Sequence, residues 1–102
     1  MNSTDESKSI ARQLLLDEAT FRFDGMADTL TDGPVVALPS PDTWEFSFQF
    51  QSRHSGYGDR VGKMLLQVIT PHSVKIVVEK GKVVSATMDG RWDMIEQKML
   101  TK

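Results

Sequence analysis

The sequence predicts an α+β fold with two layers. We expect an antiparallel sheet of four or five strands with amino-terminal and carboxy-terminal helices packed on one face. Three observations predict it: apolar residues recur at helical spacing near the start, later segments alternate apolar and polar residues, and no helix-length crossovers separate the strands. With 102 residues, the chain has the length of one domain, which we assign to residues 1–102.

The first segment is predicted to be a helix from about residue 5 to residue 18. Ser3 to Glu6 supply hydroxyl and carboxylate groups, which cap free amides and suit the helix dipole. Ile10, Leu14 and Leu15 then form an apolar stripe at helical spacing. This stripe predicts that the helix is held by packing on the sheet.

Residues 20–42 predict a short strand followed by a connector. Phe21 and Phe23 alternate with polar neighbours until the Asp24-Gly25 turn pair, so residues 20–24 are expected to be extended. The stretch 25–42 contains three prolines and scattered polar residues. It predicts a connector with one helical turn at residues 26–30 and an edge segment at residues 35–38.

The segment 43–51 carries the clearest pattern in the chain. Trp44, Phe46, Phe48 and Phe50 alternate with polar residues, which predicts a central strand with one buried face. A long polar loop, 52–63, is expected next, then a strand at 64–70 that pairs with 43–51. Residues 74–78 and 83–88 predict a hairpin around Gly81, and residues 92–99 predict a last helix.

Composition narrows the classes of function. The chain has no cysteine, which excludes disulfides, thiolate metal sites and cysteine catalysis. A formal net charge of −2 argues against nucleic acid as a partner, and no apolar run reaches the roughly 20 residues of a membrane span. The polar, acidic start predicts that there is no signal peptide and hence a cytoplasmic location. No cofactor is expected.

Charge is distributed unevenly along the chain. Residues 1–51 hold nine acidic and three basic residues, whereas residues 52–102 hold five acidic and nine basic residues. The two halves either neutralise each other within one fold or meet between two copies. A homodimer along an open sheet edge such as residues 83–88 is therefore one expected assembly.

The loop 52–63 concentrates the groups that could bind a ligand. Its candidates are His54, Tyr57, Asp59, Arg60 and Lys63. The glycine spacing fails the phosphate-loop pattern, because Gly58 is too close to Gly62-Lys63 and Met64 follows in place of Ser or Thr. The loop is therefore either a glycine-rich connection or a binding site for a small anionic ligand.

Metal sites are not expected. A simple pairing of strands 43–51 and 64–70 would separate His54 from His72 by a strand length, roughly 20 Å. Asp24, Asp28 and Asp32 recur every four residues, but they lack a calcium-loop pattern and predict a solvated face.

Four short stretches carry a resemblance to known sequences: Phe21–Gly25, Gly56–Arg60, Thr70–His72 and Asp89–Met94. Together they resemble a group of small, uncharacterised archaeal microbial proteins, over about residues 10–98. The resemblance implies no activity, cofactor or catalytic residue. The helix-then-sheet order is also similar to cystatin-like folds, and fold alone does not determine function.

Two functional hypotheses follow. The first is a small non-enzymatic module that binds or assembles with an unidentified protein. The alternative is a small enzyme that acts on an anionic small molecule through the loop, with His54 or Asp59 as base and Arg60 or Lys63 holding the substrate. A deep pocket that contains the loop's polar residues would favour the enzyme.

Overall fold

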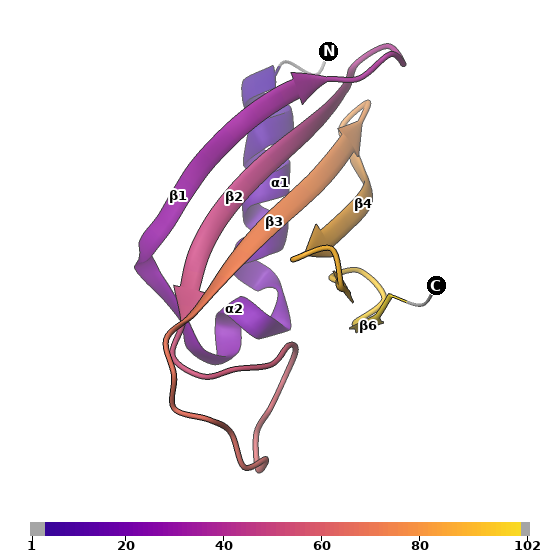
Figure 1. Cartoon of the computed structure of the whole chain (residues 1–102). Helices are drawn as coiled ribbons and strands as arrows, with labels where there is room; N and C mark the ends of the chain where they lie inside the picture. Colours follow the sequence, from indigo (N-terminus) through magenta and orange to yellow (C-terminus); the bar gives the residue numbers. More distant parts are fainter. Residues whose placement is uncertain (1–3, 101–102) are drawn as a thin grey trace.

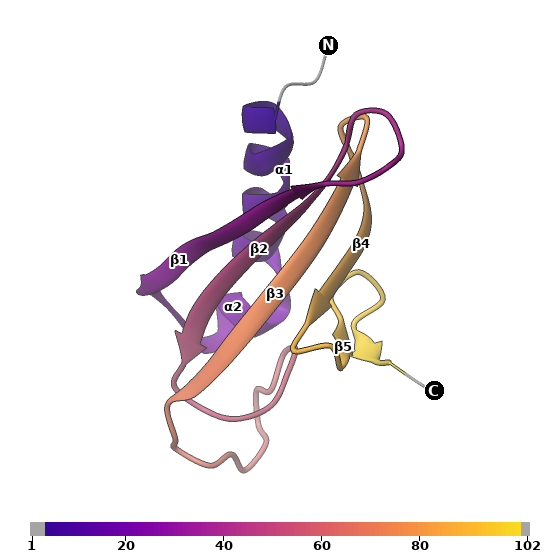
Figure 2. The ribbon, with the colours of Figure 1, turned by 45° about the horizontal axis from the view of Figure 1, so that its top comes forward.

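The computed structural model describes residues 4–100, which form one six-stranded antiparallel sheet and two amino-terminal helices. The sheet order is β1-β2-β3-β4-β5-β6, so each strand pairs with the next one in the chain. The helices cover one face of the sheet (Figures 1 and 2). The elements are α1 (Thr4–Asp17), α2 (Ala19–Asp24), β1 (Gly25–Ala37), β2 (Thr43–Ser52), β3 (Thr70–Glu79), β4 (Lys82–Met88), β5 (Trp92–Asp93) and β6 (Lys98–Met99). The α+β class is confirmed, but the predicted count of four or five strands is wrong.

The first predicted helix is present as α1. Ser7, Ala11 and Leu15 recur every four residues and are buried against the sheet, while Ile10 and Leu14 are half-buried beside them. The predicted cap at Ser3 lies outside the described residues. Acidic residues in the first turn complement the helix dipole, as expected.

The predicted strand at residues 20–24 is wrong, because these residues form α2. The Glu18 carboxylate accepts hydrogen bonds from the backbone amides of Thr20 (2.8 Å) and Phe21 (3.4 Å), which caps the short helix. The amide of Gly25 closes the other end by donating to the Phe21 carbonyl. Two alternating aromatic residues are too short a pattern to identify a strand, and the hydrogen bonds at both ends favour the helix.

The predicted connector is also wrong over most of its length, because residues 25–37 form the edge strand β1 and residues 26–30 form no helical turn. Within this stretch only the predicted edge segment is confirmed: Val35 to Ala37 pair with Trp44 to Phe46 of β2. The pairing has two register shifts, between Met26 and Thr31 and between Asp32 and Val35. These irregularities break the two-residue alternation by which a strand is recognised.

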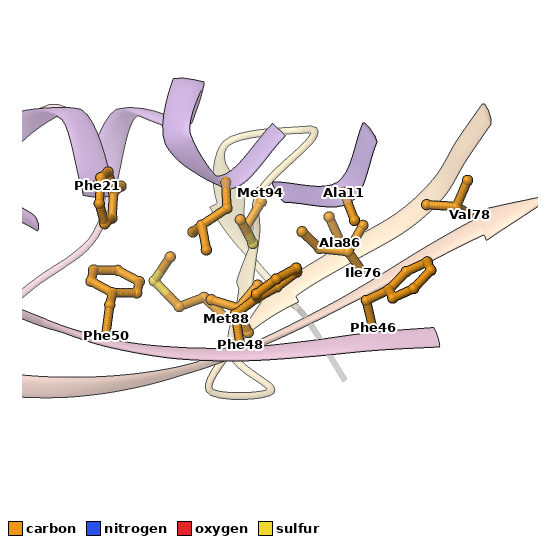
Figure 3. Close-up of a cluster of buried hydrophobic side chains, with 12 residues drawn as sticks. Ala11, Phe21, Phe46, Phe48, Phe50, Ile76, Val78, Ala86, Met88 and Met94 are labelled. Atoms are coloured by element: carbon orange, nitrogen blue, oxygen red, sulfur yellow. The ribbon is translucent and has the colours of Figure 1, made fainter. Parts of the chain in front are cut away.

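The aromatic strand is confirmed as β2, and its apolar face forms the core. Phe46, Phe48 and Phe50 are almost fully buried, as predicted. They lie between the helices and the sheet in Figure 3. The buried apolar residues are Ala11, Leu15, Phe21, Phe46, Phe48, Phe50, Val74, Ile76, Val78, Ala86, Met88 and Met94.

The predicted hairpin between β3 and β4 is present. Lys80 and Gly81 both have positive φ, 51° and 80°, which is the turn geometry that matches the twist of a two-residue hairpin. Glu79 pairs with Lys82 across the turn.

The predicted carboxy-terminal helix is wrong. Residues 92–99 form the small β5–β6 hairpin, in which Trp92 pairs with Met99 and Asp93 with Lys98. The Asp93 carboxylate accepts from the amides of Ile95 and Glu96 at 2.9 and 3.0 Å, and Gln97 has a φ of 57°. The side chain of Asp93 therefore holds a turn where a helix could have begun.

The predicted strand at 64–70 joins the sheet only at its last residue. β2 pairs directly with β3, from Thr43 opposite Glu79 to Ser52 opposite Thr70. Residues 53–69 therefore form one long loop beyond the end of the sheet, which is visible in both views of the ribbon (Figures 1 and 2). No helix within residues 4–100 is long and apolar enough to cross a membrane.

Candidate functional site

The loop 53–69 has two parts with different surroundings. We call residues 53–60 the loop base and residues 61–69 the arm. The base lies against the end of β2 and against α2, whereas the arm has no strand partner. Two backbone hydrogen bonds join the two parts: the amide of Ser55 donates to the carbonyl of Leu66 at 3.4 Å, and the amide of Lys63 donates to the carbonyl of Arg60 at 3.1 Å.

Arg60 organises the loop base. Its side chain is 2% exposed and donates to the carbonyls of four residues in the loop base and of one in α2; these are His54, Ser55, Gly56, Gly58 and Thr20. The guanidinium also forms an ion pair with Asp24 at 2.8 Å and lies 4.7 Å from the ring centre of Phe23. All of these donors are used within the fold, so the loop base wraps around one buried cation.

Asp24, the last residue of α2, is the anion that balances this cation. Its side chain is 5% exposed. One carboxylate oxygen binds Arg60, and the other accepts from the backbone amide of His54 at 2.8 Å and lies 2.9 Å from the His54 ring. Asp24 therefore joins α2 to both ends of the loop base.

A second polar chain runs under the loop base. The Oγ of Ser52 lies 3.1 Å from Nε2 of His72, and Nδ1 of His72 lies 2.7 Å from the Asp89 carboxylate. This order of groups is that of serine hydrolases. Here, however, Ser52 is 0% exposed and its hydroxyl donates to the carbonyl of His54. In this arrangement the hydroxyl is closed to a substrate and supports the loop base.

Tyr57 caps this polar chain. Its hydroxyl donates to Asp89 at 2.9 Å, and its ring stacks on Trp92 with a centroid distance of 5.6 Å. Burial and the hydrogen bond to Asp89 raise the pKa of Tyr57 to about 12. The phenol therefore stays protonated near neutral pH and acts as a hydrogen-bond donor.

Glu18 ties α2 to the β5–β6 hairpin. Besides capping α2, its buried carboxylate accepts from Nε1 of Trp92 at 2.9 Å and from the Gln97 amide at 2.8 Å. Thr20 donates to the same carboxylate and accepts the backbone amide of Gly58 at 2.6 Å. Three carboxylates, of Glu18, Asp24 and Asp89, thus hold the loop base.

The arm shows the opposite character. Met64 is fully exposed, Val61 and Leu66 are 75% and 71% exposed, and Val68 and Ile69 are about half exposed. Met64, Leu66 and Val68, which predicted the apolar face of a strand, are therefore exposed, and of residues 64–69 only Leu65 is half-buried. Large apolar side chains in this number on one segment are unusual for a surface that stays in water.

The candidate ligand residues of the sequence do not form one pocket. Arg60 is buried, His54 and Tyr57 are partly buried, and Asp59 and Lys63 are exposed. Asp59 accepts the backbone amide of Val61 and does not pair with Arg60. A depression of about 540 Å³ lies between α2 and the loop, and of the five candidates only Asp59 lines it, together with Asp17, Ala19, Arg22, Phe23 and Val61.

Several residues of the site were missed in the sequence. Glu18, Ser52 and Asp89 carry no motif, and Asp24 was expected on a solvated face. The expected separation of the histidines is wrong: Ser52 contacts both the carbonyl of His54 and the ring of His72, because β2 pairs with residues 70–79 and not with 64–70. Within residues 4–100 no three side chains of a metal-binding type form a cluster.

A comparison of the chain with protein-family models, with curated proteins and with solved structures finds no match, so the resemblances to archaeal proteins and to cystatin-like folds stay predictions.

Proposed function

We propose that this protein is a small binding or assembly module without catalytic activity, and that the arm is its contact surface. One observation carries the proposal. An apolar arm stands exposed on a loop base that is held by a buried ion pair, Arg60 with Asp24. A large exposed apolar segment beside a polar, well-ordered support is the usual composition of a protein interaction site.

The length and composition of the arm support this proposal. Antiparallel neighbours such as β2 and β3 need about two to five residues to connect, so folding does not require a 17-residue loop. Residues 64–70 are uncharged, rich in β-forming residues and free of proline, which in an unprotected segment promotes aggregation. A partner that covers the arm removes this hazard.

A dye that fluoresces on apolar surfaces tests whether the arm is presented. The test variant is Met64→Ser with Leu66→Ser, and the matched control is Val35→Ser with Val84→Ser, which changes two exposed apolar residues on strands. At concentrations where the chain is monomeric, we expect anilinonaphthalene sulfonate fluorescence to fall strongly in the arm variant and little in the control. Equal fluorescence of the arm variant and the wild type would show that the arm is covered by its own fold, and the proposal would be wrong.

Binding of an anionic small molecule is the second candidate function. The observation behind it is the depression beside α2, which is large enough for a metabolite and places Arg22 where it could pair with an anion, although Asp17 and Asp59 also line it. His54 and Lys63 lie elsewhere on the same loop, and we retain them with Tyr57 and Arg60 as candidates.

A thermal-shift screen against anionic metabolites tests this second function. A ligand at a hundred times its dissociation constant adds about 2.7 kcal/mol to stability. The shift should disappear in Arg22→Ala but persist in Arg53→Ala, which is exposed and outside the depression.

A further inference from the structure

We infer that the partner of the arm is the arm of a second copy of this chain, paired antiparallel about a two-fold axis at Gln67. The inference rests on the proposed function and names the partner for that surface. It differs from the dimer expected along residues 83–88, because here the contact lies beyond the end of the sheet (Figure 1).

The sequence of the arm is complementary to itself. With Gln67 opposite Gln67, antiparallel pairing places Leu66 opposite Val68 and Leu65 opposite Ile69. Each of these pairs occurs twice by symmetry and joins two apolar side chains. Pairs of this kind are the units that stabilise a sheet. The central amides of Gln67 can bond to each other, so no polar group of the pair needs to be buried alone.

Charges are also compatible with this pairing. No charged residue lies between Met64 and Thr70, so the paired segments carry no like charges. Lys63 falls opposite Pro71 of the second copy. The two Lys63 side chains then stand eight residues apart along the pair, about 27 Å, where repulsion between them is screened.

The backbone of the arm is available for pairing. Within residues 64–69, two backbone carbonyls accept hydrogen bonds: that of Leu66 accepts from the Ser55 amide, and that of Val68 accepts from the Thr70 hydroxyl. The arm leads directly into β3, so pairing would extend a strand that already exists. Both ribbon views show the loop beyond the sheet and helices, where a second copy has access (Figure 2).

The open sheet edges are less suitable partners for the arm. β1 has two register shifts, and Pro34 within it lacks an amide hydrogen; both features discourage strand addition. The open part of β4 begins at Lys82, beside Lys80, and its later residues Thr87 and Met88 already pair with β5. Lysines at this edge repel Lys63 of an incoming arm.

Charge substitutions at the axis test the pairing. Gln67 is exposed in the single chain, so its replacement leaves the fold intact. In sedimentation at high micromolar concentration we expect the wild type at twice the 11.5 kDa chain mass. Gln67→Lys and Gln67→Glu should each raise the dissociation constant at least about tenfold, because like charges meet at the axis. An equimolar mixture of the two variants should dimerise again.

Disulfide trapping locates the contact. The chain has no cysteine, so each variant carries a single thiol. Gln67→Cys should oxidise to a covalent dimer much faster than Asp28→Cys on β1 or Val84→Cys on β4, because only residue 67 meets its own copy. The controls are also exposed and report random collisions.

The outcomes separate this inference from the proposed function. A wild type that sediments as a monomer overturns the inference, and so does a dimer that residue 67 fails to trap or that neither charge substitution weakens. If the dye assay still detects the exposed arm in such a monomer, the proposed function stands and its partner is another protein. If the dye assay also fails, both proposals fall.

Discussion

The two parts of the loop between β2 and β3 follow one another in the chain but are built on opposite principles. The loop base holds a buried cation whose donors are used by five carbonyls and by Asp24. The arm exposes Met64 and Leu66 to water, and two backbone hydrogen bonds connect it to the base. The first part is a small polar core, and the second is an uncovered apolar segment.

This difference supports the proposal that the arm is the contact surface. Burying a guanidinium costs several kcal/mol unless a carboxylate and further acceptors compensate for it. In the loop base, Asp24 and five carbonyls compensate for the burial of Arg60, although the sheet does not require a long loop. The base determines how the arm leaves the fold, and we attribute binding to the arm and support to the base.

The largest effect is expected when the base loses its cation. Arg60→Ala removes the guanidinium that binds Asp24 and five carbonyls, so the free energy of unfolding should fall by about 3–5 kcal/mol in denaturant titrations. Arg53→Ala is the matched control on the exposed side of the base and should change it by less than about 0.5 kcal/mol. Similar values for the two variants would contradict the role of Arg60 as the buried centre of the loop base.

A smaller effect is expected at the polar chain under the base. Ser52→Ala removes the hydrogen bond to the His54 carbonyl and the contact with His72, which should lower the free energy of unfolding by about 1–3 kcal/mol. The control, Ser85→Ala, changes an exposed serine of β4. If Ser52→Ala left stability unchanged, Ser52 would be free of a structural role and its place beside His72 would need another explanation.

The pKa of the Tyr57 phenol tests whether the loop base has the contacts described above. Its pKa of about 12 exceeds the usual 10.0 through burial and the bond to Asp89, so folding favours the neutral phenol. The stabilisation is complete below about pH 10 and is lost as the pH rises through 12. Asp89→Asn should lower the pKa towards 10.0 without reaching it, because burial remains.

Near-ultraviolet absorbance of tyrosinate measures this pKa, since Tyr57 is the only tyrosine of the chain. A folded wild type that titrates near pH 10 would contradict the contact with Asp89 and the order of the base. Tyr57→Phe serves as the blank.

The smallest effect on stability is expected in the arm. Leu66→Ser at concentrations where the chain is monomeric should change the free energy of unfolding by no more than about 0.5 kcal/mol, because Leu66 makes few contacts in the single chain. Leu15→Ser, the same substitution in the core, should cost more than about 3 kcal/mol. A large loss at Leu66 would show that the arm packs on its own fold.

The two-residue pattern of the arm shows that alternation in the sequence does not by itself place a segment in the sheet. Met64, Leu66 and Val68 alternate along residues 64–70, but apolar Leu65 and Ile69 interrupt the pattern that β2 keeps strictly, and of the two segments only β2 lies in the sheet over its whole length. Four aromatic residues on one face of β2 bury enough surface to select its place, whereas the arm competes with residues 70–79 for the same partner. The two-residue period alone does not determine which of two candidate strands pairs with β2.

The sequence by itself determined α1, the buried face of β2 and the turn at Lys80-Gly81, because each depends on neighbours a few residues away. It also predicted a candidate site on the loop 52–63, which stays a prediction. Only the tertiary structure decided that Arg60 serves Asp24, 36 residues earlier, and that Glu18 reaches Trp92, 74 residues later. Whether a charged side chain binds a ligand or holds the fold depends on which groups surround it, and these groups come from segments that no local pattern brings together.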